Sequence, residues 1–77
     1  MKEYIYVYGE DCSKCHMLEP HITKRAEKNE IDLHKYKFTD LDQETFQITS
    51  IPTLIIRDEE ETKTLQYEEI LSLITNQ

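Results

Sequence analysis

Tryptophan is absent from this 77-residue sequence, glycine occurs once, and cysteine and proline occur twice each. So few cysteines cannot build the dense disulfide framework that stabilises small secreted proteins. No stretch approaches the roughly 20 apolar residues that a membrane span requires, and the start of the chain lacks the apolar segment of a secretory signal. We therefore expect a soluble, cytoplasmic protein with no membrane partner.

Positive charge is scarce as well, because nine Lys and Arg residues stand against 16 Asp and Glu residues, for a net charge of −7. Such a surface repels a phosphate backbone, so nucleic acid is not an expected partner. The five Tyr and two Phe residues can share a core, which favours a folded chain over a disordered one. At this length we predict a single domain, residues 1–77, and a monomer.

The pattern of apolar residues predicts a chain that alternates between strands and helices. Residues 3–8 are β-branched or aromatic after Glu3, which is typical of a central strand, with Ile5 and Val7 on the face opposite to the tyrosines. A helix is predicted over residues 12–29, because apolar residues recur there at spacings of three and four: Cys15, Leu18, Ile22 and Ala26. The remaining predicted elements are strands at 31–38, 53–56 and 62–66, a short helix at 39–47, and a closing helix with the apolar stripe Tyr67, Ile70, Leu71 and Ile74.

The order of these elements limits the topology of the sheet. A strand–helix–strand unit at the start requires a right-handed parallel crossover, whereas the late pair of strands must form an antiparallel hairpin. The sheet is therefore predicted to be mixed, with helices on its faces. Lys35 and Lys37 interrupt the strand at 31–38 and favour an edge position. Gly9 is expected at a sharp turn after the first strand, and Pro20 is expected to kink the first helix.

Cys12 and Cys15 point to chemistry, because the segment Cys12-Ser13-Lys14-Cys15 lies where the first strand meets the first turn of the helix. At a helix start, unpaired amides and the positive end of the dipole stabilise a thiolate and lower the pKa of Cys12 from the free value of about 8.5. Lys14 would add positive charge nearby. Cys15, on the apolar stripe, would be more buried and keep its proton. Cys12 is thus the expected attacking thiol in disulfide exchange, and Cys15 the resolving thiol.

The placement of this motif after a strand, with Pro20 five residues beyond the second cysteine, resembles the thioredoxin family. Residues 46–54 are similar to the family's other hallmark, a loop that ends in Ile51-Pro52-Thr53. The resemblance implies a thioredoxin fold of order βαβ(α)ββα, with a four-stranded mixed sheet and helices on both faces. It also implies a cis Ile51–Pro52 bond that faces the cysteines, and a substrate held by the backbone of Ile51. The resemblance covers nearly the whole chain, in the short form found in glutaredoxins and in small glutaredoxin-like donors to ribonucleotide reductase.

Some positions differ from the family pattern. Asp11 stands where thioredoxins have Trp, Ser13-Lys14 replaces their Gly-Pro, and Tyr6 stands at the position of their buried acid. The Thr-Val and Gly-Gly residues with which glutaredoxins bind glutathione are absent too. The resemblance implies a dithiol–disulfide oxidoreductase without a cofactor, which reduces protein disulfides and is recharged by a thioredoxin-reductase-type enzyme. Ribonucleotide reductase is a candidate recipient, and a glutathione-linked glutaredoxin is the alternative.

A different class of function also fits the motif. Cys12 to His16 spell Cys-x-x-Cys-His, the attachment pattern of c-type haem, for which Met17 or another His would supply an axial ligand. A Cys-x-x-Cys pair can also be half of a zinc site, which here would need His16, His21 or His34 to complete it. With no second cysteine pair and no export signal, we expect neither metal nor haem.

Overall fold

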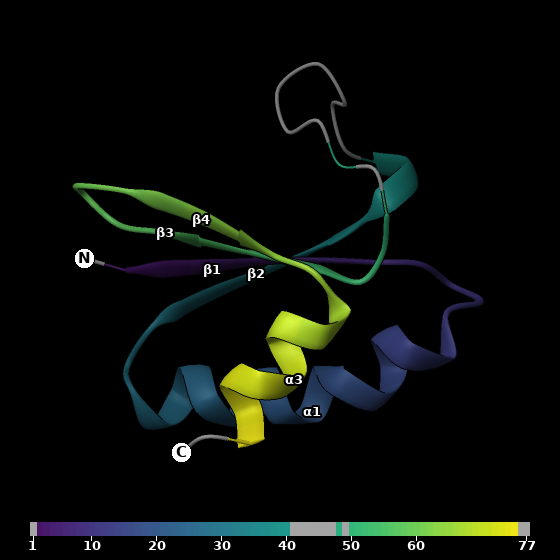
Figure 1. The fold of residues 1–77 in the computed structure, drawn as a ribbon, viewed down its shortest axis with the longest axis horizontal. Coiled ribbons are helices and arrows are strands. Elements are labelled where there is room, and N and C mark those ends of the chain that lie inside the picture. The colour runs from purple at the N-terminus through teal and green to yellow at the C-terminus, as the bar shows by residue number, and fades with distance from the viewer. Residues whose placement is uncertain (1, 41–47, 49, 76–77) are drawn as a thin grey trace.

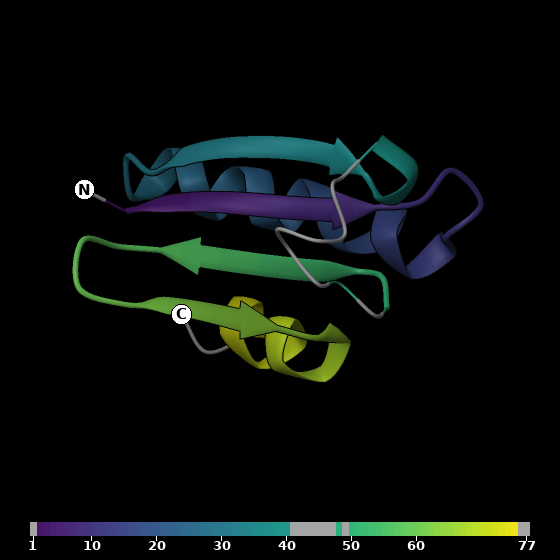
Figure 2. The ribbon, with the colours of Figure 1, turned by 90° about the horizontal axis from the view of Figure 1, so that it is seen from above.

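A computed structural model of the protein describes residues 2–40, 48 and 50–75. Its elements, in chain order, are β1 (Glu3–Tyr8), α1 (Ser13–Lys28), β2 (Asp32–Lys37), the 3₁₀ turn η1 (Phe38–Asp40), β3 (Thr53–Arg57), β4 (Thr62–Leu65) and α3 (Tyr67–Thr75). The strands form one sheet in the order β2-β1-β3-β4, in which β1 runs parallel to β2 and antiparallel to β3, and β3 runs antiparallel to β4. Both α1 and α3 lie on the same face of this sheet (Figures 1 and 2).

The topology predicted from the sequence is confirmed. The sheet is mixed, β1 is central, and β2 lies at an edge, as its lysines indicated. Each strand begins and ends within one residue of its predicted bounds. Of the short helix predicted at 39–47, the structure describes only residues 39 and 40, which belong to η1. Residues 41–47 lie outside the described part of the chain. The prediction of a helix on the second face of the sheet concerns residues outside the described part of the chain.

Strand β1 forms the centre of the core, because side chains pack on both of its faces. The buried residues on the helix side are Tyr4, Tyr6, Leu18, Ile22, Ala26, Leu54 and Ile70. Those on the opposite side are Ile5, Val7, Ile48 and Ile55. The predicted separation of the tyrosines from Ile5 and Val7 is thereby confirmed. Each large apolar side chain withdrawn from water contributes about 1.5–3 kcal/mol, so the strand that leads to the cysteines is firmly anchored.

Helix α1 is capped at both ends by side chains. The Sγ atom of Cys12 accepts a hydrogen bond from the amide of Cys15 at 3.1 Å, so the first cysteine is itself the N-cap. At the other end, Nδ2 of Asn29 donates to the carbonyl of Arg25 at 2.9 Å. Nη1 of Arg25 donates in turn to the carbonyl of Leu73 in α3 at 3.3 Å. These contacts fix the length of α1 and fasten it to its neighbouring helix.

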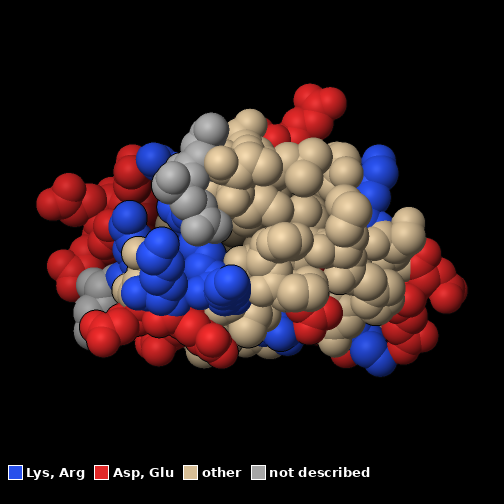
Figure 3. Space-filling model, turned by 90° about the horizontal axis from the view of Figure 1, so that it is seen from below, with Lys and Arg blue, Asp and Glu red and all other residues tan. Residues whose placement is uncertain are grey.

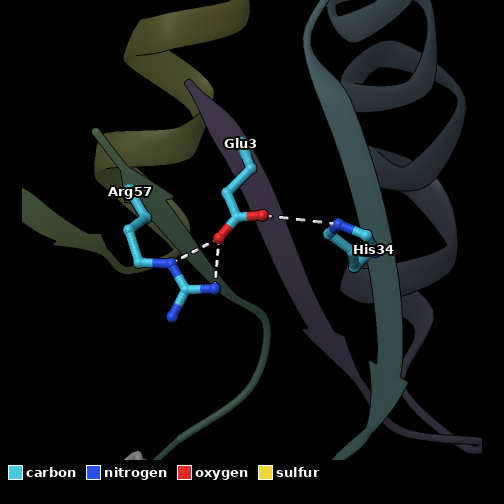
Figure 4. A network of polar contacts seen from close by, with 3 residues as sticks. All are labelled: Glu3, His34 and Arg57. Atoms are coloured by element: carbon cyan, nitrogen blue, oxygen red, sulfur yellow. Dashed lines mark hydrogen bonds and ion pairs between the residues drawn. The ribbon is translucent and has the colours of Figure 1, made fainter. Parts of the chain in front are cut away.

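Glu3 joins three strands at the end of the sheet remote from the cysteines (Figure 4). Its carboxylate accepts a hydrogen bond from the guanidinium of Arg57, which lies opposite on β3, and sits 3.4 Å from Nε2 of His34 on β2. An ion pair exposed to water contributes about 0–1 kcal/mol. The Glu3 network therefore aligns the strand ends more than it stabilises the fold.

Charge is unevenly distributed on the helix-covered side of the molecule. Figure 3 shows Lys and Arg side chains gathered at one end of this side, where α1 finishes with Arg25 and Lys28. The start of α1, which follows the cysteine turn, lies at the opposite end (Figure 1). Neither described α-helix is long and apolar enough to cross a membrane. Pro20 lies inside α1, and the kink expected there stays a prediction.

Candidate active site

Cys12 and Cys15 are joined by a disulfide at the junction between β1 and α1, with their Cα atoms 5.2 Å apart. The two residues differ in environment. Cys12 is half-buried at the N-cap, whereas Cys15 is only 1% exposed, on the apolar stripe of the first turn. The unequal exposure expected from the sequence is therefore present, with Cys12 the more exposed of the two cysteines.

Tyr6 reaches the cysteine turn from the central strand. Its side chain is fully buried, and its hydroxyl donates a hydrogen bond to the carbonyl oxygen of Cys15 at 2.6 Å. Burial raises the pKa of the Tyr6 hydroxyl well above its usual range, and the negative charge of Glu19 raises it further. Tyr6 is therefore a neutral donor that holds the first turn of α1 against β1. Tyr6 stands at the position of the family's buried acid, so this position supplies no carboxylate in this chain.

The loop that leads into β3 lies beside the end of β1. Its Ile51–Pro52 peptide bond is cis. The antiparallel register pairs Val7 with Thr53, and continuing that register by two residues brings Gly9 opposite Ile51. A Cβ atom built on Gly9 would lie only 2.5 Å from Cδ1 of Ile51. The cysteine turn and the proline loop are therefore in direct contact.

This contact explains the single glycine of the chain. The chain does turn after Gly9, as expected, but the φ angle of Gly9 is not in the left-handed region. Backbone conformation therefore does not require glycine here. The missing side chain instead leaves room for Ile51, which packs on the cluster around Ile5 and Val7.

Gly9→Ala is expected to destabilise the protein by about 0.5–1.5 kcal/mol, the cost of turning the half-buried Ile51 side chain away from a preferred rotamer. The added methyl group collides with Cδ1 of Ile51. Adding Ile51→Val, which removes that Cδ1 atom, should recover most of the loss, and denaturant midpoints of all four proteins measure this coupling. A double variant whose destabilisation equals the sum of the two single variants would contradict the proposed contact.

Ile51 lies in the loop beside the cysteine turn. Among the described residues, neither its N–H nor its C=O has a hydrogen-bond partner. The side chain is half-buried, which holds these polar groups in place beside the disulfide. An extended peptide segment could pair with them as an added strand does.

The proline loop is held by polar contacts that sequence reasoning missed. Oγ1 of Thr53, a fully buried residue, donates to the carbonyl of Ser50 at 2.6 Å, and Oγ of Ser50 donates to Oε1 of Gln66 at 2.5 Å. Gln66 directly precedes α3, and its amide donates to the carboxylate of Glu69 at 3.1 Å. The start of α3 therefore fixes the loop beside the cysteines. The Gln66-x-x-Glu69 spacing, which resembles a capping box, is the signal that could have indicated this.

Lys14 is engaged with the start of α3. Its ammonium nitrogen lies over the ring of Tyr67, 4.6 Å from the ring centroid, in a cation–π contact. The charge that was expected near Cys12 thus also links the first turns of the two helices. No sequence signal predicted this partner, because the two residues are far apart along the chain.

The turn before Cys12 is tied to its surroundings on the other side. Nε2 of His16 lies 2.9 Å from the carbonyl oxygen of Glu10. The carboxylate of Glu10 is hydrogen-bonded to Nζ of Lys37 at 2.6 Å, which lowers the pKa of Glu10 and raises that of Lys37. Asp11 is exposed and, among the described residues, has no hydrogen bond or ion pair. Asp11 thus presents a free carboxylate next to the reactive disulfide.

Surface hollows lie on both sides of Ile51. The first, which we call the α3-side hollow, is lined by Ser50, Ile51, Pro52, Gln66, Tyr67, Glu68 and Glu69. The second is lined by Gly9, Glu10, Asp11, Lys37, Phe38, Thr39, Asp40 and Ile51. The two hollows share Ile51, and both include acidic residues in their lining.

Within residues 2–40, 48 and 50–75, no group of three or more His, Cys, Asp and Glu side chains is arranged to hold a metal ion. His16 faces the carbonyl of Glu10, and His34 faces the carboxylate of Glu3. The histidines proposed as partners of the cysteines in a zinc site therefore do not gather around them.

A sequence family described as the thioredoxin domain matches residues 3–75 of the chain. The chain belongs to the thioredoxin-domain family. No match was found among curated protein sequences.

Solved structures share the fold of this thioredoxin-domain protein over almost its whole length. Thioredoxin 1 of Thermosipho africanus TCF52B has a TM-score of 0.75 at 22% identity, covering 97% of this chain and 99% of that chain. Trxlp of Edwardsiella tarda EIB202 has a TM-score of 0.78 at 17% identity, covering 97% and 80%. The oxidised thioredoxin of Plasmodium falciparum has a TM-score of 0.75 at 18% identity, covering 97% and 79%. The fold is therefore the thioredoxin fold, and with the Cys12–Cys15 disulfide it supports thiol–disulfide oxidoreductase chemistry in general terms.

Proposed function

We propose that this thioredoxin-domain protein reduces disulfides of other proteins through Cys12 and Cys15. The thiolate of Cys12 attacks one sulfur of the substrate disulfide, forms a mixed disulfide and releases the other substrate sulfur as a thiolate. Cys15 then loses its proton and attacks the sulfur of Cys12. This second step releases the remaining substrate thiolate and forms the Cys12–Cys15 disulfide, so that two electrons pass to the substrate.

The observation that carries this proposal is the unequal placement of the two sulfurs. Cys12 caps α1 at a half-buried position, where its sulfur already accepts the amide of Cys15 at 3.1 Å. A helix N-terminus stabilises negative charge on such an atom. Cys15 is buried one turn away and close enough to close the disulfide. The backbone groups of Ile51, which have no hydrogen-bond partner within the described part of the chain, lie nearby and could hold the substrate segment.

The direct test is the catalysed reduction of insulin by dithiothreitol. The precipitation of the released insulin chain measures the rate of this reaction. The wild-type protein should accelerate the reaction, and a Cys12→Ser/Cys15→Ser variant should not. The serine variant keeps the fold and the net charge, so it controls for effects of added protein. Equal rates with both proteins would overturn the proposed function.

We further propose that a thioredoxin-reductase-type enzyme reduces the Cys12–Cys15 disulfide back to two thiols. Glutathione carries a net negative charge. The acidic residues Glu68 and Glu69, which line the α3-side hollow, would therefore repel it. No glycine pair follows β3 to receive glutathione. The short chain resembles small donors to ribonucleotide reductase, so that enzyme is a candidate recipient of the electrons.

Recycling by the reductase is expected to exceed recycling by glutathione on the order of tenfold, equivalent to about 1.4 kcal/mol of missing glutathione recognition. Consumption of NADPH measures both reactions, with thioredoxin reductase alone in one and with glutathione and glutathione reductase in the other. Efficient glutathione turnover would instead favour the glutaredoxin alternative. An absorption spectrum of the same purified protein separates both from the haem or metal carrier that the Cys12-x-x-Cys15-His16 motif also allows.

A further inference from the structure

The α3-side hollow combines three kinds of surface next to the reactive disulfide. Its lining includes the half-buried apolar residue Ile51, the aromatic residue Tyr67, and the acidic residues Glu68 and Glu69. A long side chain with an apolar stem and a cationic head matches this combination, because such side chains lay their methylenes on apolar surface and keep their charge at a polar edge.

The ring of Tyr67 already contacts a cation of the protein itself. The ammonium of Lys14 lies 4.6 Å from its centroid, so the geometry of the site brings positive charge to this ring. Two carboxylates stand against this one ammonium around the hollow. The surroundings of the hollow therefore carry one negative charge in excess, which favours a cationic group over an anionic one at the exposed Glu68.

Glu68 and Glu69 are not equivalent. The carboxylate of Glu69 accepts the amide of Gln66 and so caps α3. Glu68 is exposed, and among the described residues its side chain has no hydrogen bond or ion pair. In the first turn of α3, the carboxylate of Glu69 therefore caps the helix, whereas Glu68 is exposed at the lining of the hollow.

The wider surface supports the same preference. Glu10, which pairs with Lys37, and Asp11, which is unpaired among the described residues, line the hollow on the other side of Ile51, and the cluster of Lys and Arg side chains on the helix-covered side lies away from the start of α1 (Figure 3). A partner approaching the disulfide therefore meets negative charge on both sides of Ile51, which attracts basic segments and repels acidic ones.

We propose that the α3-side hollow is a subsite for an Arg or Lys side chain of the substrate, placed next to the substrate's disulfide, and that Glu68 determines this specificity. The inference rests on the proposed function and names its substrate class: proteins whose reducible cysteine is flanked by a basic residue. The stem of that residue lies on Ile51, and its cation pairs with Glu68.

Matched peptides test this subsite. Three disulfide-bonded peptides, identical except for Arg, Gln or Glu at the residue next to the cysteine, are reduced by the full-length protein, and kcat/KM is measured for each. The Arg peptide is expected to be preferred over the Gln peptide by about two- to fivefold, the range of an exposed ion pair. The preference should shrink at about 1 M salt, where charges are screened within roughly 3 Å.

Glu68→Gln should bring the Arg-to-Gln ratio close to one, and Glu68→Lys should favour the Glu peptide. Because each ratio is measured on one variant, a change in folded fraction cancels. The control is Glu60→Gln, which removes the same charge in the exposed turn between β3 and β4, at the end of the sheet remote from the disulfide. Glu60→Gln should leave the ratio unchanged.

Equal rates for the Arg and Gln peptides with the wild-type protein would overturn the subsite while leaving the proposed function intact. An equal fall of the ratio in Glu60→Gln and Glu68→Gln would also overturn it, because net charge would then explain the preference. Failure to reduce any of the three peptides would instead overturn the proposed function, and the subsite with it.

Discussion

Cys15→Ser is expected to arrest the protein as a covalent complex with its substrate. Cys12 remains at the half-buried N-cap, where the amides of the first turn stabilise its thiolate, so attack on the substrate disulfide proceeds. Release requires the buried sulfur of Cys15, which the variant lacks. The mixed disulfide should therefore accumulate, visible as a mass increase equal to the substrate thiol and reversed by dithiothreitol.

Cys12→Ser is expected to give no such complex and to reduce catalysed exchange to the uncatalysed rate. Its remaining sulfur, on Cys15, is 1% exposed and packed in the core, where a substrate disulfide cannot reach it. The two single variants have the same amino-acid composition, so each is the control for the other. Trapping by Cys12→Ser in place of Cys15→Ser would contradict the assignment of attacking and resolving sulfurs.

Local pattern was sufficient to predict the strands and the faces of β1. The alternation of Ile5 and Val7 with the tyrosines can be satisfied only when both faces of one strand are covered, and the structure covers both. Helix α1 was predicted for the same reason, since the spacing of Leu18 and Ile22 leaves one apolar stripe. The cysteine pair at the strand–helix junction followed from these two elements.

The contacts that complete the candidate site could not be predicted in this way. The pairing of Gly9 with Ile51 depends on the register between β1 and β3, which local pattern does not specify. The bond from Ser50 to Gln66 and the contact of Lys14 with Tyr67 likewise join residues that only the folded chain brings together. Such contacts arise from three-dimensional arrangement, so the substrate-facing surface is less predictable from sequence than the strand that supports it.

Tyr6→Ala is expected to destabilise the protein by about 3–5 kcal/mol, the usual loss when a buried aromatic side chain is removed. Tyr6 is fully buried in the centre of the helix-side core. In a domain this small, a single core rarely supplies more than about 3–5 kcal/mol, so most of the variant should be unfolded. Denaturant-induced unfolding followed by circular dichroism measures the loss.

Tyr6→Phe separates the hydroxyl from the ring. It keeps the packing but deletes the 2.6 Å hydrogen bond to the carbonyl of Cys15, at a cost of about 0.5–1.5 kcal/mol. The matched control is Tyr8→Phe on the same strand and face, whose ring centroid lies 6.4 Å from that of Tyr6 and whose hydroxyl, among the described residues, makes no hydrogen bond. Tyr8→Phe should be near neutral. Equal losses in the two variants would show that the bond to Cys15 contributes nothing.

The pH dependence of unfolding provides an independent check on Tyr6, with a definite sign. Burial raises the pKa of Tyr6 in the folded protein above the ordinary tyrosine value of about 10. Below that pH both the folded and the unfolded states keep the proton, and the full stabilisation is present. Above it the unfolded chain loses the proton while folded Tyr6 retains it, so stability falls as pH rises, by up to about 1.4 kcal/mol per pH unit. Tyr6→Phe lacks this titration, and its stability should fall less steeply above pH 10 than that of the wild type; parallel curves would contradict a buried, neutral Tyr6 beneath the cysteine turn.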